Sequence, residues 1–213
     1  MCGRYYLELN SLEKEKYALN AEINYETNFN ITPQSQVPIV INDELIMATW
    51  GYFPEWLKKQ KNSKPLFNTR WETIKEKRTF QSAYKKNRCL VPLSGWYEWK
   101  NVNDEKHPYY FFGNEILVHA AGLYWKRSSG DLEFSIITQD AYGDLASIHN
   151  RTPLLLSKKN EEKWIANYDV DLLYEEISEN TQTLVNFHRV TKAVNNPKNK
   201  NSSLINEYTE VPF

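Results

Sequence analysis

Residues 37–50, VPIVINDELIMATW, decide the class of fold. Two apolar runs flank Asn42-Asp43, a pair of residue types that joins the strands of tight hairpins. The stretch therefore predicts a β-hairpin. A second hairpin is predicted over residues 108–125, PYYFFGNEILVHAAGLYW, with Gly113-Asn114 at its turn.

The segments around these hairpins add strands and helices in no regular alternation. Strands are predicted over residues 88–92, 132–141 and 185–191, an aromatic-rich turn over SGWYEW at 94–99, and a polar loop over 58–65. Helices are predicted over four segments, namely 11–19, 72–87, 157–164 and 169–177. This order predicts an α+β fold with a largely antiparallel sheet flanked by helices. Without repeats or a linker, we expect one domain over residues 1–213.

The composition excludes several classes of protein. Aromatic residues make up 14% of the 213 residues, which is too many for a disordered chain. Two Cys without paired spacing exclude a disulfide scaffold or a Cys-rich zinc module. Metal-ligand spacings and nucleotide-binding motifs are absent, so we expect no metal and no cofactor. With no secretory signal and no long apolar run, we expect a cytoplasmic protein without membrane contact.

The net charge of −1 hides an asymmetry along the chain. Residues 56–100 hold twelve Lys or Arg and three Glu, a net of +9, whereas the remainder carries −10. A local basic surface favours a polyanion such as nucleic acid as the partner. The alternative is an ordinary, solvated lysine-rich face.

Cys2 directly follows the initiator Met. If Met1 is trimmed, Cys2 becomes a 1,2-aminothiol whose amine and thiol have ordinary pKa values of about 7.7–8.0 and about 8.5. An aldehyde that meets this group forms an imine, which the thiol closes into a thiazolidine ring. The alternative is a second residue with no role. Gly3 permits close approach of the backbone to a ligand, and the Arg4 guanidinium is suited to binding a phosphate.

Other residues are candidates for acid–base chemistry. Glu98 lies among Trp96, Tyr97 and Trp99, an aromatic setting that raises the pKa of a carboxyl, although an exposed Glu on a strand explains the pattern equally well. His149 stands in a polar segment between apolar ones. Asn68 and Arg70 precede the basic helix, where they could also serve as a capping region. The remaining candidates are expected to be structural: Cys89 in the core, and His107, His119 and His188.

Ordered motifs along most of the chain resemble the SOS response-associated peptidase (SRAP) family. They are MCGR, NITPQSQVPIV, WGYFPEW, FNTRWETIKEKRTFQSAYKKNRCLVPLSGWYEW, AGLYW, FSIITQDA, IHNRTPLLL and VNNP. The resemblance implies one α+β domain with a curved sheet. It also implies a sensor of abasic sites in single-stranded DNA that forms a thiazolidine link through its N-terminal Cys.

The resemblance also assigns roles to individual residues. Cys2 would be the nucleophile, Asn68 would position the sugar and the amine, Glu98 would be the general acid/base and His149 would complete the proton transfers. DNA contacts are implied for six further residues: Arg4, Trp56, Arg70, Trp99, Thr138 and Arg151. Departures from the family pattern at Gln34-Ser35, Asn150 and Thr152 spare the four catalytic positions.

Two other functions stay open at this point. The first is an N-terminal-nucleophile cysteine peptidase; because only Met1 precedes Cys2, ordinary trimming would then replace self-cleavage. The second is a non-covalent binder of single-stranded DNA. For each of these three functions, we expect the protein to be a monomer.

Overall fold

The computed structural model describes residues 2–9, 17, 23, 25–166, 168–179 and 185–209. Within these ranges the strands form two mostly antiparallel sheets, which confirms the predicted fold class. The five-stranded sheet has the order β12 (Val185–Arg189), β8 (Glu105–Gly113), β7 (Gly95–Val102), β1 (Tyr5–Leu7), β2 (Asn28–Ile31). The seven-stranded sheet has the order β11 (Arg151–Pro153), β10 (Leu132–Asp140), β4 (Glu44–Trp50), β3 (Gln36–Ile41), β6 (Arg88–Leu93), β9 (Val118–Lys126), with β5 (Asn68–Arg70) beside β10.

The larger sheet is curved until it closes on itself. Strand β9 pairs with β6 along one edge and with β10 along the other, so β10, β4, β3, β6 and β9 form a ring. The pairings of β10 with β4 and with β5 are parallel, and the other pairings in this sheet are antiparallel. The strands of this ring contribute many residues of the main apolar core, among them Ile39, Leu90 and Phe134.

Two Asn-Asp pairs make the tight hairpin turns. Asn42 and Asp43 have φ of 50° and 63° and join β3 to β4, which confirms the first predicted hairpin. Asn103 and Asp104 have φ of 50° and 64° and join β7 to β8. Positive φ at both central residues is the geometry of a type I′ turn, whose twist matches that of the strands.

The predicted hairpin over residues 108–125 is wrong. Strand β8 ends at Gly113 and pairs with β7 and β12, whereas β9 begins at Val118 and belongs to the other sheet. The segment between them carries the chain from one sheet to the other. A Cβ at Gly113 would lie 2.5 Å from Val118 Cγ1, so glycine serves close packing here instead of a hairpin turn.

Other predicted boundaries also differ from the structure. Residues 94–99, expected to form a turn, belong mostly to β7, which pairs with β8, and the side chains of Trp96 and Tyr97 are buried. The predicted helix over residues 72–87 is divided in two, because Lys77 is extended at ψ 114° between the pieces. The pieces are η1 (Trp71–Thr73) and α3 (Arg78–Lys86). The predicted helix over 11–19 lies almost entirely outside the described residues.

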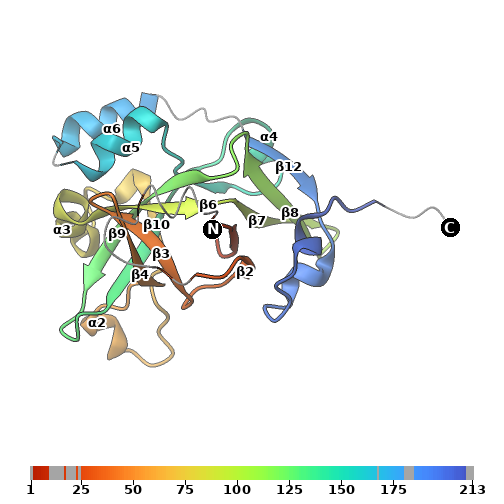
Figure 1. Cartoon of the computed structure of the whole chain (residues 1–213), viewed down its shortest axis with the longest axis horizontal. Coiled ribbons are helices and arrows are strands. Elements are labelled where there is room, and N and C mark those ends of the chain that lie inside the picture. Colours follow the sequence, from red (N-terminus) through yellow and green to blue (C-terminus); the bar gives the residue numbers. More distant parts are fainter. Residues whose placement is uncertain are drawn as a thin grey trace.

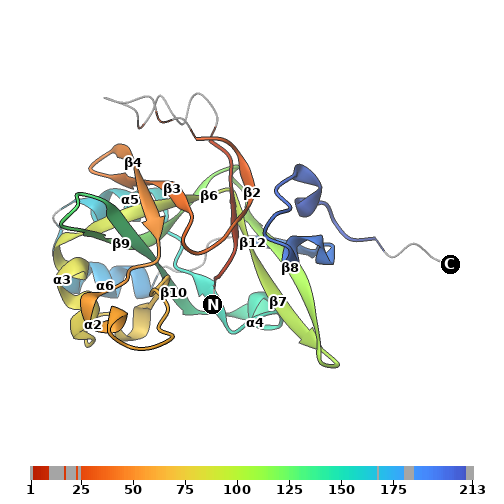
Figure 2. The same ribbon diagram turned by 90° about the horizontal axis from the view of Figure 1, so that it is seen from below.

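The remaining helices are short and lie around the sheets. They are α2 (Glu55–Lys58), α4 (Gly143–Ala146), α5 (Lys158–Ile165), α6 (Val170–Glu179), η2 (Lys192–Asn195) and η3 (Ser202–Ile205). The predicted helices at 157–164 and 169–177 are confirmed as α5 and α6, and the Ser157 side chain caps α5 by accepting from Asn160 N. Figures 1 and 2 show α3, α5 and α6 on one side of the molecule and the β7–β8 hairpin on the other. Among the described residues, no helix has the length and apolar character needed to cross a membrane.

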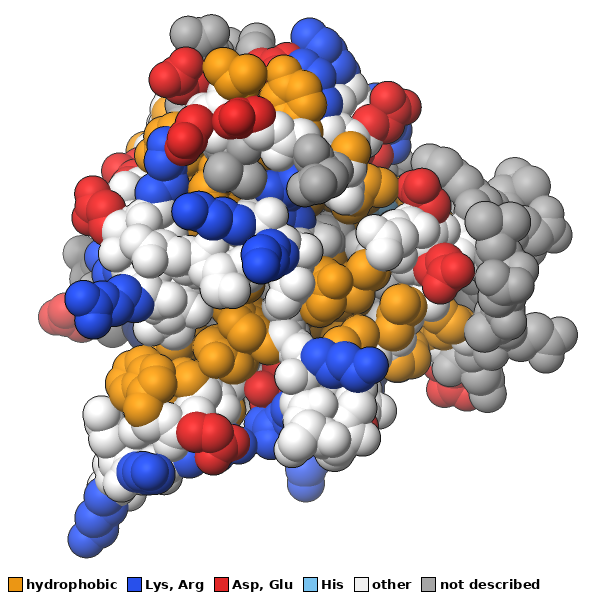
Figure 3. Space-filling model, turned by 90° about the vertical axis from the view of Figure 1, so that its left-hand side faces the viewer, with side chains coloured by type: hydrophobic (Ala, Val, Ile, Leu, Met, Phe, Trp, Pro, Cys, Tyr) orange, Lys and Arg blue, Asp and Glu red, His pale blue; other side chains and the backbone are white. Residues whose placement is uncertain are grey.

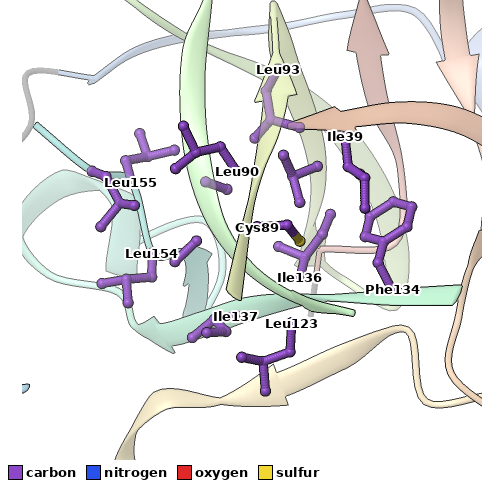
Figure 4. Packing of buried hydrophobic residues seen from close by; sticks show 14 of the residues in the cluster. Ile39, Cys89, Leu90, Leu93, Leu123, Phe134, Ile136, Ile137, Leu154 and Leu155 are labelled. Carbon is purple, nitrogen blue, oxygen red and sulfur yellow. The ribbon is translucent and has the colours of Figure 1, made fainter. Parts of the chain in front are cut away.

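Cys89 lies in the main core, as predicted. Its side chain is fully buried among aliphatic neighbours such as Leu123 and Ile136 (Figure 4). A Cβ on Gly122 would come within 2.8 Å of Cys89 Sγ, so the sulfur packs directly over that glycine. Trp164 Nε1 donates to the Cys89 carbonyl at 2.9 Å and ties α5 to this core.

Candidate active site

Four side chains that the sequence predicts as catalytic lie in one cluster between the two sheets. Cys2 precedes β1 and Glu98 lies on β7, two strands that are neighbours in the smaller sheet. Asn68 begins β5, which pairs with β10 of the larger sheet. His149 lies in the connection between α4 and β11. The site therefore depends on how the two sheets meet.

Asn68 holds the backbone of Cys2. Its Nδ2 donates to the Cys2 carbonyl oxygen at 2.7 Å. The other amide atom, Asn68 Oδ1, is buried and accepts no hydrogen bond among the described residues. A buried amide oxygen of this kind is ready to accept from an N–H or O–H group brought to the site.

Glu98 is the acidic group of the cluster. Only 3% of it is exposed, and burial raises its pKa to about 7. A carboxyl with this pKa is partly protonated near neutral pH and can both donate and accept a proton. Glu98 Oε2 lies 3.7 Å from His149 Nδ1.

His149 has a fixed orientation beside Glu98. His149 Nδ1 lies 3.0 Å from Arg151 N and 3.2 Å from the Arg151 carbonyl oxygen, so the backbone of Arg151 fixes the orientation of the ring. Burial lowers the pKa of His149, so the neutral ring is favoured at pH 7. The pair thus combines a partly protonated carboxyl with a neutral imidazole.

The Cys2 thiol is completely buried in this structure. Burial raises its pKa, and the neighbouring charge of Glu98 raises it further. Cys2 is therefore a neutral thiol at pH 7, unlike a cysteine whose pKa is lowered to form a thiolate.

The six predicted DNA-binding residues fall into two groups. Trp56 on α2 is 53% exposed and Arg70 at the end of β5 is exposed, so both side chains are accessible. Trp99 is half-buried, and its Nε1 donates to Asn195 Oδ1 at 2.8 Å. The other three (Arg4, Thr138 and Arg151) are occupied by contacts inside the protein.

Arg4 and Arg151 illustrate this internal use. Arg4 Nη1 donates to Asn30 Oδ1 and to the Val194 carbonyl, both at 2.7 Å. The Arg151 guanidinium is buried, makes a two-pronged contact with Glu72 at 2.8 and 2.9 Å and reaches Asp140 at 2.5 Å.

Thr138 is fully buried beneath this arginine. Arg151 Nη2 lies 3.4 Å from Thr138 Oγ1 and donates to the Thr138 carbonyl at 2.6 Å. These positions favour a role in holding the site's walls over direct contact with a strand of DNA.

The three histidines predicted to be structural all have internal partners. His119 Nδ1 lies 3.0 Å from Glu161 Oε1, His188 Nε2 lies 2.7 Å from the Ile205 carbonyl, and His107 Nδ1 accepts from Arg189 at 2.8 Å. Within the described part of the chain, no group of three or more His, Cys, Asp or Glu side chains could hold a metal ion.

Sequence reasoning did not single out Asn195 or Lys106. Both line an open pocket of about 450 Å³ together with Glu98, Trp99 and His149. Asn195 lies in VNNP, the last of the ordered motifs, so this motif could have identified it as a candidate site residue. Lys106 carries no comparable signal, because it follows an ordinary hairpin turn.

The basic stretch at residues 56–100 does not form one patch. Part of it is paired internally: Lys58 with Glu55, and Lys75 with Asp171 at 2.7 Å. Arg88 is buried and donates to backbone carbonyls, including Trp164 O at 2.6 Å. Figure 3 shows the face that carries α2 and α3, where Lys and Arg side chains are separated by neutral and apolar surface.

Comparison with known proteins gives consistent matches over most of the chain. The family model for SOS response associated peptidase (SRAP) matches residues 1–197. The abasic site processing protein YedK of Escherichia coli is 32% identical over 226 residues, covering 96% of this chain and 99% of that protein. The abasic site processing protein YoqW of Bacillus subtilis is 30% identical over 225 residues, covering 98% and 100%.

Solved structures show the same fold. A protein from Bacteroides thetaiotaomicron superposes with a TM-score of 0.73 at 24% identity, covering 85% of this chain and 86% of that one. A phage-related protein from Bordetella bronchiseptica superposes with a TM-score of 0.71 at 25% identity, covering 90% and 95%.

Proposed function

The chain belongs to the SOS response associated peptidase (SRAP) family, and on this premise we propose that it processes abasic sites in single-stranded DNA through a covalent link to Cys2. The observation that carries the proposal is the hydrogen bond from Asn68 Nδ2 to the Cys2 carbonyl at 2.7 Å, beside a carboxyl whose pKa is about 7. Relatives over nearly the whole chain are named abasic site processing proteins.

The proposed reaction begins with the removal of Met1, which frees the amine of Cys2. The amine attacks the aldehyde of the ring-opened deoxyribose and forms an imine with loss of water. The S–H group then adds across the C=N bond: sulfur joins the carbon, the hydrogen goes to the nitrogen, and a thiazolidine ring results. An amine-first order fits the raised pKa of the Cys2 thiol, because thiolate attack is not required.

Glu98 and His149 supply the proton transfers in this scheme. Protonated Glu98 donates to the departing hydroxyl of the intermediate, and its ionised form accepts a proton when the sugar ring opens. His149 passes protons between Glu98 and solvent. Asn68 keeps Cys2 at a fixed distance from both groups, which favours ring closure over release of the imine.

The proposed path of the DNA runs along the accessible residues of the site. Arg70 would neutralise a phosphate beside Asn68, and Trp56 and Trp99 would stack on neighbouring bases, a contact worth about 1–3 kcal/mol per base. Arg4, Thr138 and Arg151 would act by holding the walls of the site in place. We further propose that residues 1–213 work as one domain and as a monomer, without metal or cofactor.

A crosslinking assay tests the proposal. Protein from which Met1 has been removed is incubated with a single-stranded oligonucleotide that carries one abasic site, and adducts are resolved on a denaturing gel and by intact mass. Wild type and the Cys89→Ala control should form the adduct, whereas Cys2→Ala should form none. A strand with a tetrahydrofuran abasic analogue, which has no aldehyde, should give no adduct with any variant.

The order of the steps can be tested with Cys2→Ser. This variant keeps the amine but lacks the thiol, so cyanoborohydride should trap its imine as a stable adduct. The absence of any adduct from wild-type protein, or equal yields from wild type and Cys2→Ala, would contradict the proposal. Cys2-dependent turnover of peptides without an adduct would support the peptidase activity in the family's name, and Cys2-independent binding without an adduct would support a non-covalent binder.

A further inference from the structure

The pocket beside Glu98 has two donors that the proposed reaction does not use. Lys106 on β8 and Asn195 at the end of η2 are both exposed, and both line the open pocket with Glu98, Trp99 and His149. The pocket is therefore acidic and aromatic on the β7 side and carries hydrogen-bond donors on the side of β8 and η2.

The Asn195 amide has a defined orientation. Trp99 Nε1 can only donate, and its partner at 2.8 Å is Asn195 Oδ1. This contact occupies the amide oxygen and leaves the two N–H groups of Asn195 Nδ2 as the polar groups that can reach a ligand. Asn195 therefore offers donors to the pocket, and an anionic oxygen is the complementary ligand.

Asn30 anchors the loop that carries Asn195. The Asn30 side chain is only 1% exposed, and its Nδ2 donates to the carbonyls of Val194, Asn196 and Asn199 at 3.2, 3.1 and 2.8 Å. Its Oδ1 accepts from Arg4 at 2.7 Å. The backbone on both sides of Asn195 is thus fixed to strand β2 before any ligand arrives.

The same contacts engage part of the Arg4 guanidinium inside the protein. Arg4 Nη1 is shared between Asn30 and Val194, its Nε is buried, and its guanidinium lies 5.8 Å above the Trp99 ring. Arg151 is held by two carboxylates. Of the three arginines expected to hold phosphates, Arg4 and Arg151 therefore make contacts inside the protein, whereas Arg70 is exposed.

We propose that Lys106 and Asn195 form a phosphate-binding edge of the active-site pocket, which holds a backbone phosphate of the single strand next to the reacting sugar. The inference rests on the proposed function. It extends that function to the side of the pocket formed by β8 and η2, which carries hydrogen-bond donors and not a carboxyl. The Lys106 ammonium supplies the charge, and the Asn195 amide supplies oriented donors. Together with Arg70, this edge gives the strand two phosphate contacts, one from each sheet.

Binding of an undamaged, fluorescein-labelled single strand, followed by anisotropy, tests the edge without depending on covalent chemistry. Asn195→Asp keeps an oxygen for Trp99 Nε1 but replaces the donors with a negative charge, and should weaken binding about tenfold or more. Lys106→Ala should weaken binding severalfold and reduce the slope of log K against log salt by about 0.7. Asn186→Asp on β12 and Lys159→Ala on α5 are exposed controls that change the charge equally and should bind within about twofold of wild type.

The outcomes separate this inference from the proposed function. If wild type forms the abasic adduct but Asn195→Asp and Lys106→Ala bind the undamaged strand like wild type, the phosphate edge is overturned and the crosslinking function stands. If the variants weaken binding and the controls do not, the edge is supported even when no adduct forms. Equal weakening by the variants and their controls would overturn the edge in favour of a general charge effect. Circular dichroism melts of all four proteins verify that each is folded.

Discussion

Glu98, the proposed general acid/base, carries a cost in stability. In the folded protein its pKa is about 7, compared with an ordinary value of 4.5. Between these values the folded state binds more protons than the unfolded state, so the contribution of Glu98 to stability falls as pH rises from about 4.5 to about 7. At about 1.4 kcal/mol per pKa unit, the loss above pH 7 reaches up to about 3 kcal/mol.

Replacing Glu98 by glutamine should therefore stabilise the protein in a pH-dependent way. We expect Glu98→Gln to raise the free energy of unfolding by up to about 3 kcal/mol at pH 8 and by close to zero at pH 4.5. Urea denaturation at the two pH values measures the difference. Glu207→Gln, which changes an exposed carboxyl, is the control. An equal effect of Glu98→Gln at both pH values would show that packing, and not the buried charge, is responsible.

The reactivity of Cys2 should depend on the same carboxyl. The charge of Glu98 contributes to the raised pKa of the thiol. We expect Glu98→Gln to speed the alkylation of Cys2 by iodoacetamide at pH 8, because the thiolate is then less disfavoured. Cys89, whose pKa is raised by burial alone, is an internal reference in the same mass spectrum and should not change. A parallel increase at both cysteines would indicate a loosened fold instead.

At the scale of elements, turn chemistry explains which predictions were correct. The hairpin at Asn42-Asp43 could be predicted correctly because these two adjacent residues determine the type of turn. The same Asn-Asp pair recurs at 103–104, where it joins β7 to β8, so the sequence held a signal for the second hairpin that the glycine at 113 obscured. Where a chain leaves one sheet for another is decided by packing between distant strands, which no local pattern encodes.

Asn30 connects elements that are far apart in the chain. Its contacts reach carbonyls 164 to 169 positions away, and no local feature of the sequence could reveal them. The proposed catalytic residues Cys2, Asn68, Glu98 and His149 were candidates from the residues themselves, but their roles were assigned through ordered motifs that resemble a family. Their distances and protonation follow from how the two sheets meet.

Replacing Asn30 should loosen the loop at residues 192–199. Asn30→Asp keeps an acceptor for Arg4 but loses the donors to the three carbonyls, whereas Asn30→Ala loses both. We expect a loss of about 1–3 kcal/mol in unfolding free energy for each variant and faster amide exchange in the loop. The exposed Asn186→Ala, which removes a hydrogen bond to Asn114, is the control and should cost less. Unchanged exchange in the loop of Asn30→Asp would show that Arg4 alone holds it.

At the scale of the whole molecule, the charge count indicates a polyanion but not where it binds. The +9 of residues 56–100 is divided among ion pairs, a buried arginine and separated surface lysines. Five residues of that stretch were expected at the site (Trp56, Asn68, Arg70, Glu98 and Trp99), and among them Arg70 alone carries a positive charge. The basic residues of α3 lie on the side of the molecule away from the β7–β8 hairpin (Figures 1 and 2).

These distant lysines should act on the rate of encounter with DNA and not on the bound complex. The Debye length is about 8 Å at physiological salt, so charges on α3 are screened from a strand held at the site. We expect the double variant Lys85→Ala/Lys86→Ala to bind a single strand within about twofold of wild type at 150 mM salt, but to associate several times more slowly at low salt. Arg70→Ala, which removes a charge beside Asn68, should instead weaken equilibrium binding about tenfold. Stopped-flow fluorescence at two salt concentrations separates these effects, and a large equilibrium loss in the double variant would mean that the strand continues across α3.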